Sequence, residues 1–126
     1  MGTGKTGFIV FAHGSRVESA NEAVRSAAAE MGSRGGFDLV EAAFLELAPP
    51  SLSEAVERLA SRGATRVIVI PYFLTMGTHL QRDLPKLVQK AAEANRGVEI
   101  VATDPLDGHE SLSQILLDRA RAALDS

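Results

Sequence analysis

The sequence predicts an open, doubly wound, parallel four-stranded sheet in strand order 2-1-3-4, with helices on both faces. Short apolar runs rich in β-formers alternate four times with amphipathic helical stripes. Strands joined by helices run parallel, with right-handed crossovers. The first and third runs are unbroken apolar segments, whereas the second carries Glu41 and the fourth carries Glu99. We therefore expect the first and third strands at the centre and the other two at the edges.

In the first half of the chain, each of two β-rich runs is followed by a helical stripe. The strands are predicted at 8–12 and 39–45, and the helices at 20–31 and 52–60. Glycines follow both stripes and are expected to end the helices. Ser51, three residues before a glutamate, forms the capping-box pattern that marks the start of the second helix.

The second half repeats this order with different boundary signals. Strands are predicted at 67–70 and 98–102. Asp83 is expected to cap the third helix, with Pro85 in its first turn, where proline is tolerated. The last helix is predicted at 112–123 from its apolar stripe.

Composition narrows the class of protein. A chain of 126 residues fits one domain, here taken as 1–126 with a flexible tail at 1–6. A net charge of −3 without a basic run argues against nucleic-acid binding, and no apolar stretch reaches the roughly 20 residues of a membrane helix. The N-terminal residues lack the apolar core of a secretion signal, so we expect a cytoplasmic protein. Without any cysteine, metal chemistry must use His, Asp or Glu.

Three side chains able to bind metal follow three different strands. His13 comes directly after the first strand, Glu46 after the second, and His79 in the loop after the third. Ligands of open α/β sheets bind at the carboxyl ends of the strands, near the point where strand order reverses. The topology therefore predicts a metal or catalytic site at this edge. Taken singly, each of the three residues fits a structural role, and His109 fits the start of the last helix.

Cationic groups and backbone N–H groups are predicted near the same edge. Ser15 and Arg16 follow the first strand, where a β-to-α turn offers N–H groups to an anion. Arg82 and Lys86 are candidates for pairing with substrate carboxylates, or are solvated surface charges. The segment Gly2–Thr6 imitates the tail of a phosphate-binding P-loop, but a strand follows it instead of a helix, so no nucleotide site is expected.

These residues resemble a known family, the short sirohydrochlorin cobaltochelatases, which are ATP-independent class II tetrapyrrole chelatases. The similarity runs from about Phe8 to the last helix and rests on several motifs in order: Phe11-Ala12-His13-Gly14-Ser15-Arg16, Phe44-Leu45-Glu46, Pro71-Tyr72-Phe73-Leu74, and Gly77, His79, Asp83 and Pro85.

The resemblance implies insertion of a divalent metal into sirohydrochlorin during cobalamin or other tetrapyrrole biosynthesis. His13 and His79 would bind the metal, which is Co²⁺ or alternatively Ni²⁺ or Fe²⁺, and Glu46 would assist. Two copies would pair as a homodimer. The segment after the third strand would either offer an apolar surface to the ring or pack the domain; it comprises Tyr72, Phe73, Leu74, Thr75, Met76, Gly77 and Thr78.

Other functions use the same residues differently. A metal or tetrapyrrole carrier without catalysis would need the same ligands. A phosphotransfer enzyme would use His13 as its nucleophile, although such sites place an arginine where this chain has Ala12. A purely structural partner protein would need none of them.

Overall fold

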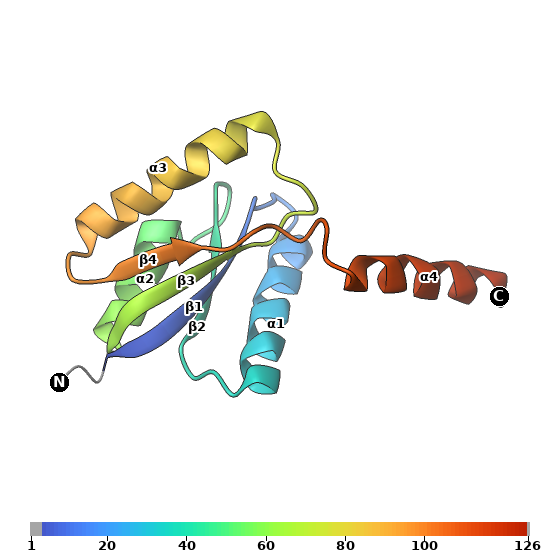
Figure 1. The fold of residues 1–126 in the computed structure, drawn as a ribbon, viewed down its shortest axis with the longest axis horizontal. Helices are drawn as coiled ribbons and strands as arrows, with labels where there is room; N and C mark the ends of the chain where they lie inside the picture. The colour runs from blue at the N-terminus through green and yellow to red at the C-terminus, as the bar shows by residue number, and fades with distance from the viewer. Residues whose placement is uncertain (1–3, 126) are drawn as a thin grey trace.

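The computed structural model describes residues 4–125 as four strands alternating with four helices (Figure 1). The order is β1 (Lys5–Ala12), α1 (Glu18–Gly35), β2 (Val40–Phe44), α2 (Leu52–Ser61), β3 (Ala64–Pro71), α3 (Thr78–Ala94), β4 (Glu99–Ala102) and α4 (Ser111–Leu124).

The four strands form one parallel sheet in the order β2-β1-β3-β4, which confirms the predicted fold class. The two strands that carry a glutamate are the edge strands. Glu41 lies 3.5 Å from Arg58, and Glu99 lies 3.4 Å from Arg66. Each edge carboxylate therefore has a cationic neighbour at the surface.

Helices cover the two faces of the sheet unequally. On one face, α2 and α3 pack on the side chains of β1, β2 and β3 in the larger buried cluster, which includes Phe11, Val67 and Val69. On the other face, α1 packs on β1 and β2 in a smaller cluster around Val10 and Phe44. Successive side chains of a strand point to opposite faces, so β1 supplies both layers, with Ile9 and Phe11 in the larger cluster and Val10 and Ala12 in the smaller one.

The capping box of α2 is present as predicted. Glu54 N–H donates to the Ser51 hydroxyl at 3.2 Å, and Ser51 N–H donates to the Glu54 carboxylate at 2.8 Å. These hydrogen bonds lower the pKa of the Glu54 carboxyl, the backbone bond from Ser51 contributing most. The helix consequently starts at the residue that the sequence indicates.

The predicted start of α3 is wrong. The helix begins at Thr78, five residues before Asp83, so Pro85 lies inside it and His79 lies in its first turn. The N–H of Gln81 donates to the Gly77 carbonyl and its side chain to the Met76 carbonyl, which stabilises the earlier start. The backbone bond lost at a proline is tolerated because the apolar face of α3 packs against the core.

Two further boundaries differ from the predictions. β1 begins at Lys5 rather than Phe8, so part of the expected tail 1–6 is strand, and residues 1–3 lie outside the described residues. Gly32 does not stop α1 but is buried within it, and the helix ends before Gly36, whose φ of 71° is left-handed.

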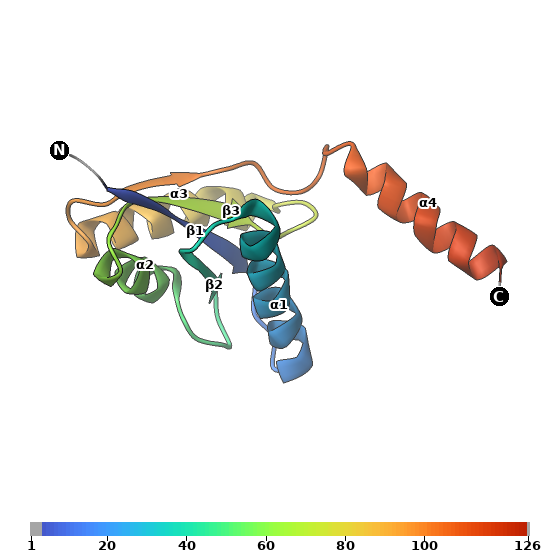
Figure 2. The same cartoon turned by 90° about the horizontal axis from the view of Figure 1, so that it is seen from below.

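The last helix stands apart from the other described helices and strands. α4 contacts no other helix or strand of the described chain, and both views show it projecting from the body beyond β4 (Figures 1 and 2). Among residues 4–125, no helix combines the length and the apolar character that crossing a bilayer would require.

Candidate metal and active site

His13 and Glu46 meet at the carboxyl edge of the sheet. Nε2 of His13 lies 3.2 Å from Oε2 of Glu46, and both side chains are more than half exposed. The two residues come from the loops that follow β1 and β2, which are neighbouring strands. The structure therefore brings together two of the three side chains that the topology predicts at this edge.

The hydrogen bonds of His13 define which ring nitrogen is available. Nδ1 lies 3.0 Å from the carbonyl oxygen of Gly14, and a carbonyl only accepts, so Nδ1 carries the proton. In a neutral ring, Nε2 then presents a lone pair toward the Glu46 carboxylate, which is also an acceptor. Two acceptors this close need a cation or a proton between them. Metal-binding histidines commonly donate their other N–H to a backbone carbonyl in this way.

The backbone brings the two loops unusually close together. The N–H of Glu46 donates to the His13 carbonyl at 3.1 Å, and the N–H of Leu45 donates to the Ala12 carbonyl at 2.9 Å. Gly14 has a φ of 96°, and a Cβ atom at this position would overlap the backbone carbonyl of Glu46. Only glycine fits both the conformation and the space.

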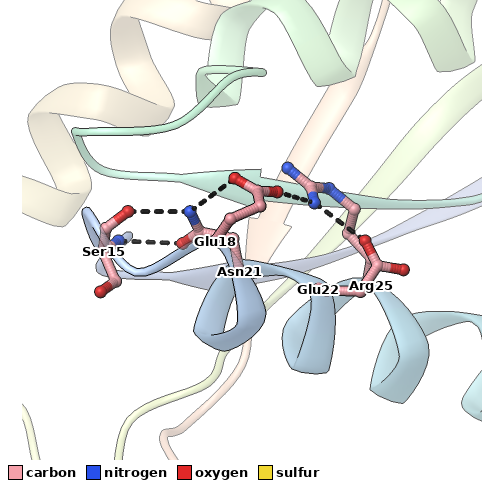
Figure 3. A network of polar contacts seen from close by, with 5 residues as sticks. All are labelled: Ser15, Glu18, Asn21, Glu22 and Arg25. Atoms are coloured by element: carbon pink, nitrogen blue, oxygen red, sulfur yellow. Dashed lines mark hydrogen bonds and ion pairs between the residues drawn. The ribbon is translucent and has the colours of Figure 1, made fainter.

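Asn21 fixes the loop after His13 from the inside of the molecule. It is 2% exposed, accepts from the Ser15 N–H at 2.9 Å and donates to the Ser15 carbonyl at 2.8 Å (Figure 3). Sequence reasoning missed this residue. Its signal was available, because Asn21, Val24 and Ala28 follow one buried stripe of α1, where a polar side chain is unusual.

Arg25 and Glu18 extend this network along α1 (Figure 3). Arg25 donates to Glu18 at 2.6 Å and to Glu22 at 3.1 Å, and its guanidinium lies 5.5 Å from the centre of the Phe44 ring. The hydrogen bond from Arg25, and then that from Asn21, lowers the pKa of the Glu18 carboxyl. The bond to Glu18 raises the pKa of Arg25. This exposed network supports the loop but carries no metal-binding geometry.

His79 lies in the first turn of α3 and has a different neighbour. Its Nδ1 is 3.4 Å from Nη2 of Arg82, one turn further along the helix. A guanidinium only donates, so in this arrangement Nδ1 accepts and Nε2 carries the proton. Within residues 4–125, no group of three or more His, Cys, Asp or Glu side chains is arranged to hold a metal. His79 is thus at the predicted edge but is not part of the His13–Glu46 pair.

The segment from Tyr72 to Gly77 divides between the two roles considered for it. Phe73 and Met76 pack against the core, and the Phe73 ring meets Phe11 edge-on at 6.2 Å. Tyr72 and Leu74 point outward, 42% and 66% exposed, while Thr75, Gly77 and Thr78 are also exposed. Part of the segment is therefore structural, and part offers apolar surface at the edge.

The remaining candidates have simple surroundings. Arg16, Arg82 and Lys86 are exposed. The Ser15 N–H is taken by Asn21, whereas the Ser15 hydroxyl accepts from the Val17 N–H at 3.0 Å and keeps its own O–H to donate to a ligand. His109 accepts from the Ser111 N–H at 3.0 Å, which is the contact of a residue at a helix start.

A family comparison identifies the class of protein. The model of the CbiX family matches residues 7–123 of this chain. The chain belongs to the CbiX family.

Relatives of this CbiX chain carry chelatase names. It is 34% identical over 120 residues to a sirohydrochlorin cobaltochelatase of Sulfurisphaera tokodaii, covering 95% of both chains. It is 35% identical over 118 residues to a chloroplastic sirohydrochlorin ferrochelatase of Arabidopsis thaliana, covering 94% of this chain and 52% of that protein. The match to this relative therefore spans about half its length.

Solved structures agree on the fold. A CbiX protein from Marinobacter aquaeolei, described as a putative cobalamin biosynthesis protein, superposes with a TM-score of 0.83 at 28% identity, covering 96% of this chain and 98% of that one. The sirohydrochlorin chelatase SirB of Bacillus subtilis, solved with cobalt, gives a TM-score of 0.86 at 24% identity over 94% of this chain and 50% of its own. At that identity, the likeness to SirB concerns the fold alone.

Proposed function

We propose that this chain is a sirohydrochlorin chelatase, which inserts Co²⁺ into the ring without ATP. Ni²⁺ and Fe²⁺ are the alternative ions, because imidazole and carboxylate ligands accept all three. The names of its relatives include both cobalt and iron chelatases and support the reaction class. In this proposal the metal is a substrate that passes through the site.

The observation that carries the proposal is the His13–Glu46 pair. Nε2 of His13 lies 3.2 Å from a carboxylate oxygen of Glu46 at the carboxyl edge of a parallel sheet, and the other ring nitrogen is oriented by a carbonyl. This is an arrangement suited to a divalent cation. Because His13 and Glu46 are both more than half exposed, a flat ring has access to an ion held there.

Metal insertion requires the ion to lose water, meet the four ring nitrogens and displace two pyrrole protons. A site with one or two imidazoles leaves coordination positions open for the ring, whereas a closed cage of four ligands would retain the ion. Glu46 can take a ring proton once the metal leaves it, and His13 can take the second through its freed Nε2. His79 would join as a ligand after its contact with Arg82 breaks.

The exposed side chains near the site suit the chemistry of the ring. Sirohydrochlorin carries many carboxylates, and this chain has a net charge of −3, so attraction must be local. Arg16, Arg82 and Lys86 are exposed cations suited to those carboxylates. Tyr72 and Leu74 offer apolar surface to the ring.

We also propose that the protein acts as a homodimer in the cytoplasm.

A carrier without catalysis would need to retain its ion, which favours three or more protein ligands in a closed arrangement. Across the described chain no such group is found, so an open site that releases its metal fits better.

The decisive experiment follows the absorption spectrum of sirohydrochlorin with purified protein and Co²⁺, Ni²⁺ or Fe²⁺ separately. We expect metallated ring to form faster than in a protein-free control, with Co²⁺ fastest and no effect of ATP. Metal binding with no acceleration over the control would instead identify a carrier.

Variants at the site separate its roles. His79→Ala should abolish insertion while the thermal unfolding curve stays unchanged, because the side chain is exposed. Glu46→Gln should slow turnover more than it weakens Co²⁺ binding, measured by calorimetry, if Glu46 accepts protons. Equal loss of both would make it a plain ligand.

A further inference from the structure

His79 and Arg82 share one face of α3, at the end of the helix that begins beside the carboxyl edge of the sheet. They are three residues apart, and Lys86 follows one turn later on the same face. All three side chains are exposed. Nη2 of Arg82 lies 3.4 Å from Nδ1 of His79. The second predicted metal ligand is therefore in contact with a cation before any metal or ring arrives.

The contact with Arg82 occupies the part of the His79 ring that a metal would use. A neutral imidazole has one lone pair and one N–H, and a guanidinium only donates. In the observed contact Arg82 donates to the lone pair of Nδ1, so Nε2 carries the proton. Ligation through Nδ1 requires Arg82 to leave. Ligation through Nε2 would move the ring proton to Nδ1, where it would face the Arg82 donors. Either nitrogen of His79 thus becomes available to a metal only when the guanidinium moves away.

Arg82 is held weakly where it lies. A distance of 3.4 Å is long for a hydrogen bond, and both partners are exposed to water. Among the described residues no carboxylate forms an ion pair with Arg82, not even its neighbour Asp83, whereas Arg25, Arg58 and Arg66 are each paired with a glutamate. The Arg82 guanidinium is therefore available to an acceptor stronger than an imidazole.

A carboxylate of the substrate is such an acceptor. It accepts two parallel hydrogen bonds from a guanidinium, and charge-assisted bonds are roughly twice as strong as neutral ones. Under the proposed function, the ring carries many carboxylates and meets the ion at the carboxyl edge of the sheet. Its docking brings carboxylates to the end of the sheet where α3 begins, and so to Arg82.

We propose that Arg82 masks His79, by keeping its metal-binding lone pair occupied, until a carboxylate of the tetrapyrrole draws the guanidinium away. This inference rests on the proposed function and adds an order of events to it. The ion is first held by His13 and Glu46, the ring then docks, and only then does His79 join as a ligand. Arg82 acts on the metal through His79 and is a positioning residue. The mask keeps coordination positions on the ion open until the ring nitrogens arrive.

Calorimetry of Co²⁺ binding without any ring tests the mask directly. Arg82→Met removes every donor but keeps a long, helix-compatible side chain. It should raise the Co²⁺ affinity about 2- to 10-fold, which is the range that one net hydrogen bond covers. An Arg82→Met affinity at or below that of the parent chain would overturn the proposal.

The matched control for charge is Lys90→Gln on the same helix. Lys90 is exposed and lies eight residues after Arg82, about 12 Å further along the helix axis. The substitution removes an equal charge without touching the His79 contact, so the Co²⁺ affinity should stay at the parent value. A rise equal to that of Arg82→Met would assign the effect to net charge and refute the mask.

A double variant separates masking from direct repulsion between Arg82 and the ion. In the His79→Ala background there is no ring to mask, so adding Arg82→Met should leave the Co²⁺ affinity unchanged. Both side chains are exposed, and thermal unfolding should confirm that the variants fold like the parent chain. A rise in affinity that persists without His79 would show that Arg82 acts on the ion directly, and would overturn the proposal.

A ring that cannot accept the ion tests what removes the mask. Zinc uroporphyrin is a flat polycarboxylate whose centre is already occupied. In the parent chain it should raise the Co²⁺ affinity, and Co²⁺ should raise the affinity for this probe by the same factor, because coupling between two sites is reciprocal. Arg82→Met should reduce the coupling about 2- to 10-fold, and Lys90→Gln should preserve it. Coupling that is unchanged in Arg82→Met would contradict release of the mask by a carboxylate.

The spectral assay with sirohydrochlorin and Co²⁺ is run on the same preparations. A parent chain that inserts the metal but fails the calorimetric tests would overturn the mask alone. A chain that passes the calorimetric tests but forms no metallated ring would support the mask and overturn the proposed function.

Discussion

His13 lies in a loop that the rest of the chain fixes at several points, whereas His79 stands in the exposed first turn of α3. The His13 ring is oriented by the Gly14 carbonyl and by Glu46, and Asn21 ties down the residue two positions later. The His79 ring has one contact of 3.4 Å, to Arg82. The two imidazoles at one sheet edge therefore differ in how far their positions are set before any ligand arrives.

The difference suggests that His13 and His79 would act at different stages of handling the metal. A fixed ligand reduces the cost of capturing the ion, because little side-chain freedom is lost on binding. A loosely held ligand can swing toward the metal and release it again. In the proposed function, His13 and Glu46 would hold the incoming ion, and His79 would be the ligand that moves during insertion.

Gly14→Ala should have the largest effect, because it disturbs the loops that carry His13 and Glu46. The new Cβ overlaps the Glu46 carbonyl in a left-handed conformation, so the two loops must separate. We expect a loss of stability of about 3 kcal/mol or more and at least about a 100-fold fall in insertion rate, since a displacement near 1 Å is this costly in active sites. Thermal unfolding and the spectral assay measure the two effects.

Gly36→Ala provides the control for this substitution. Gly36 is also left-handed, with a φ of 71°, but no atom lies within 4 Å of an added Cβ. Gly36→Ala should lower the free energy of unfolding by only about 1 kcal/mol, because alanine is strained in a left-handed conformation, and should leave the insertion rate unchanged. If Gly14→Ala and Gly36→Ala had the same effects on stability and insertion rate, the close approach of the His13 and Glu46 loops would not matter for insertion.

Asn21→Ala should loosen the loop that carries His13 without introducing a steric clash. It leaves the N–H and carbonyl of Ser15 without their partner, at a cost of about 1–3 kcal/mol. The freed loop should lower the affinity for Co²⁺ several-fold, measured by calorimetry, more than it lowers the maximal rate.

The matched control is Asn95→Ala, at the C-terminal end of α3. It removes one hydrogen bond, from its side chain to the Ala91 carbonyl, and should cost about 1 kcal/mol with no change in Co²⁺ affinity. If Asn21→Ala reduced stability but left metal affinity intact, Asn21 would be a purely structural residue.

The sequence predicts the fold well because its signals are local and repeated. Strand order follows from the edge glutamates and from the crossover rule, and the capping box at Ser51 predicts the start of α2. The α3 start failed because Asp83 and Pro85 are strong local signals that tertiary packing overrides. The isolation of α4 is invisible to periodicity, since a stripe predicts that a helix packs but not on which surface.

The site was predictable only in part, for a similar reason. Topology brings His13 and Glu46 together because their strands are hydrogen-bonded neighbours. The contact of His79 with Arg82 depends on where α3 begins, and that boundary was wrong. The buried stripe of α1 could have marked Asn21, but its hydrogen bonds to Ser15 depend on a loop conformation that no spacing rule specifies.

Lowering the pH should test His13 and His79 together as metal ligands, with a smaller effect than the substitutions above. Only unprotonated imidazole binds a metal, so binding must release any proton on the ligating nitrogen. We expect the insertion rate to fall as the pH decreases from neutrality toward 5, with Co²⁺ affinity falling in parallel. A rate that stays flat over this range would contradict histidine ligation, provided that circular dichroism shows an unchanged fold.

The smallest expected effect concerns the outer part of the network behind His13. Arg25 and then Asn21 lower the pKa of Glu18 below its ordinary value of 4.5, so the folded state favours the carboxylate. The resulting stabilisation is present above the unfolded pKa and is lost as the pH falls through the folded one. Glu18→Gln should therefore flatten the dependence of unfolding free energy on pH below about 4.5 and change little at pH 7. Glu57→Gln, on the exposed side of α2, is the control; an equal flattening there would assign the acid sensitivity to general charge and not to this network.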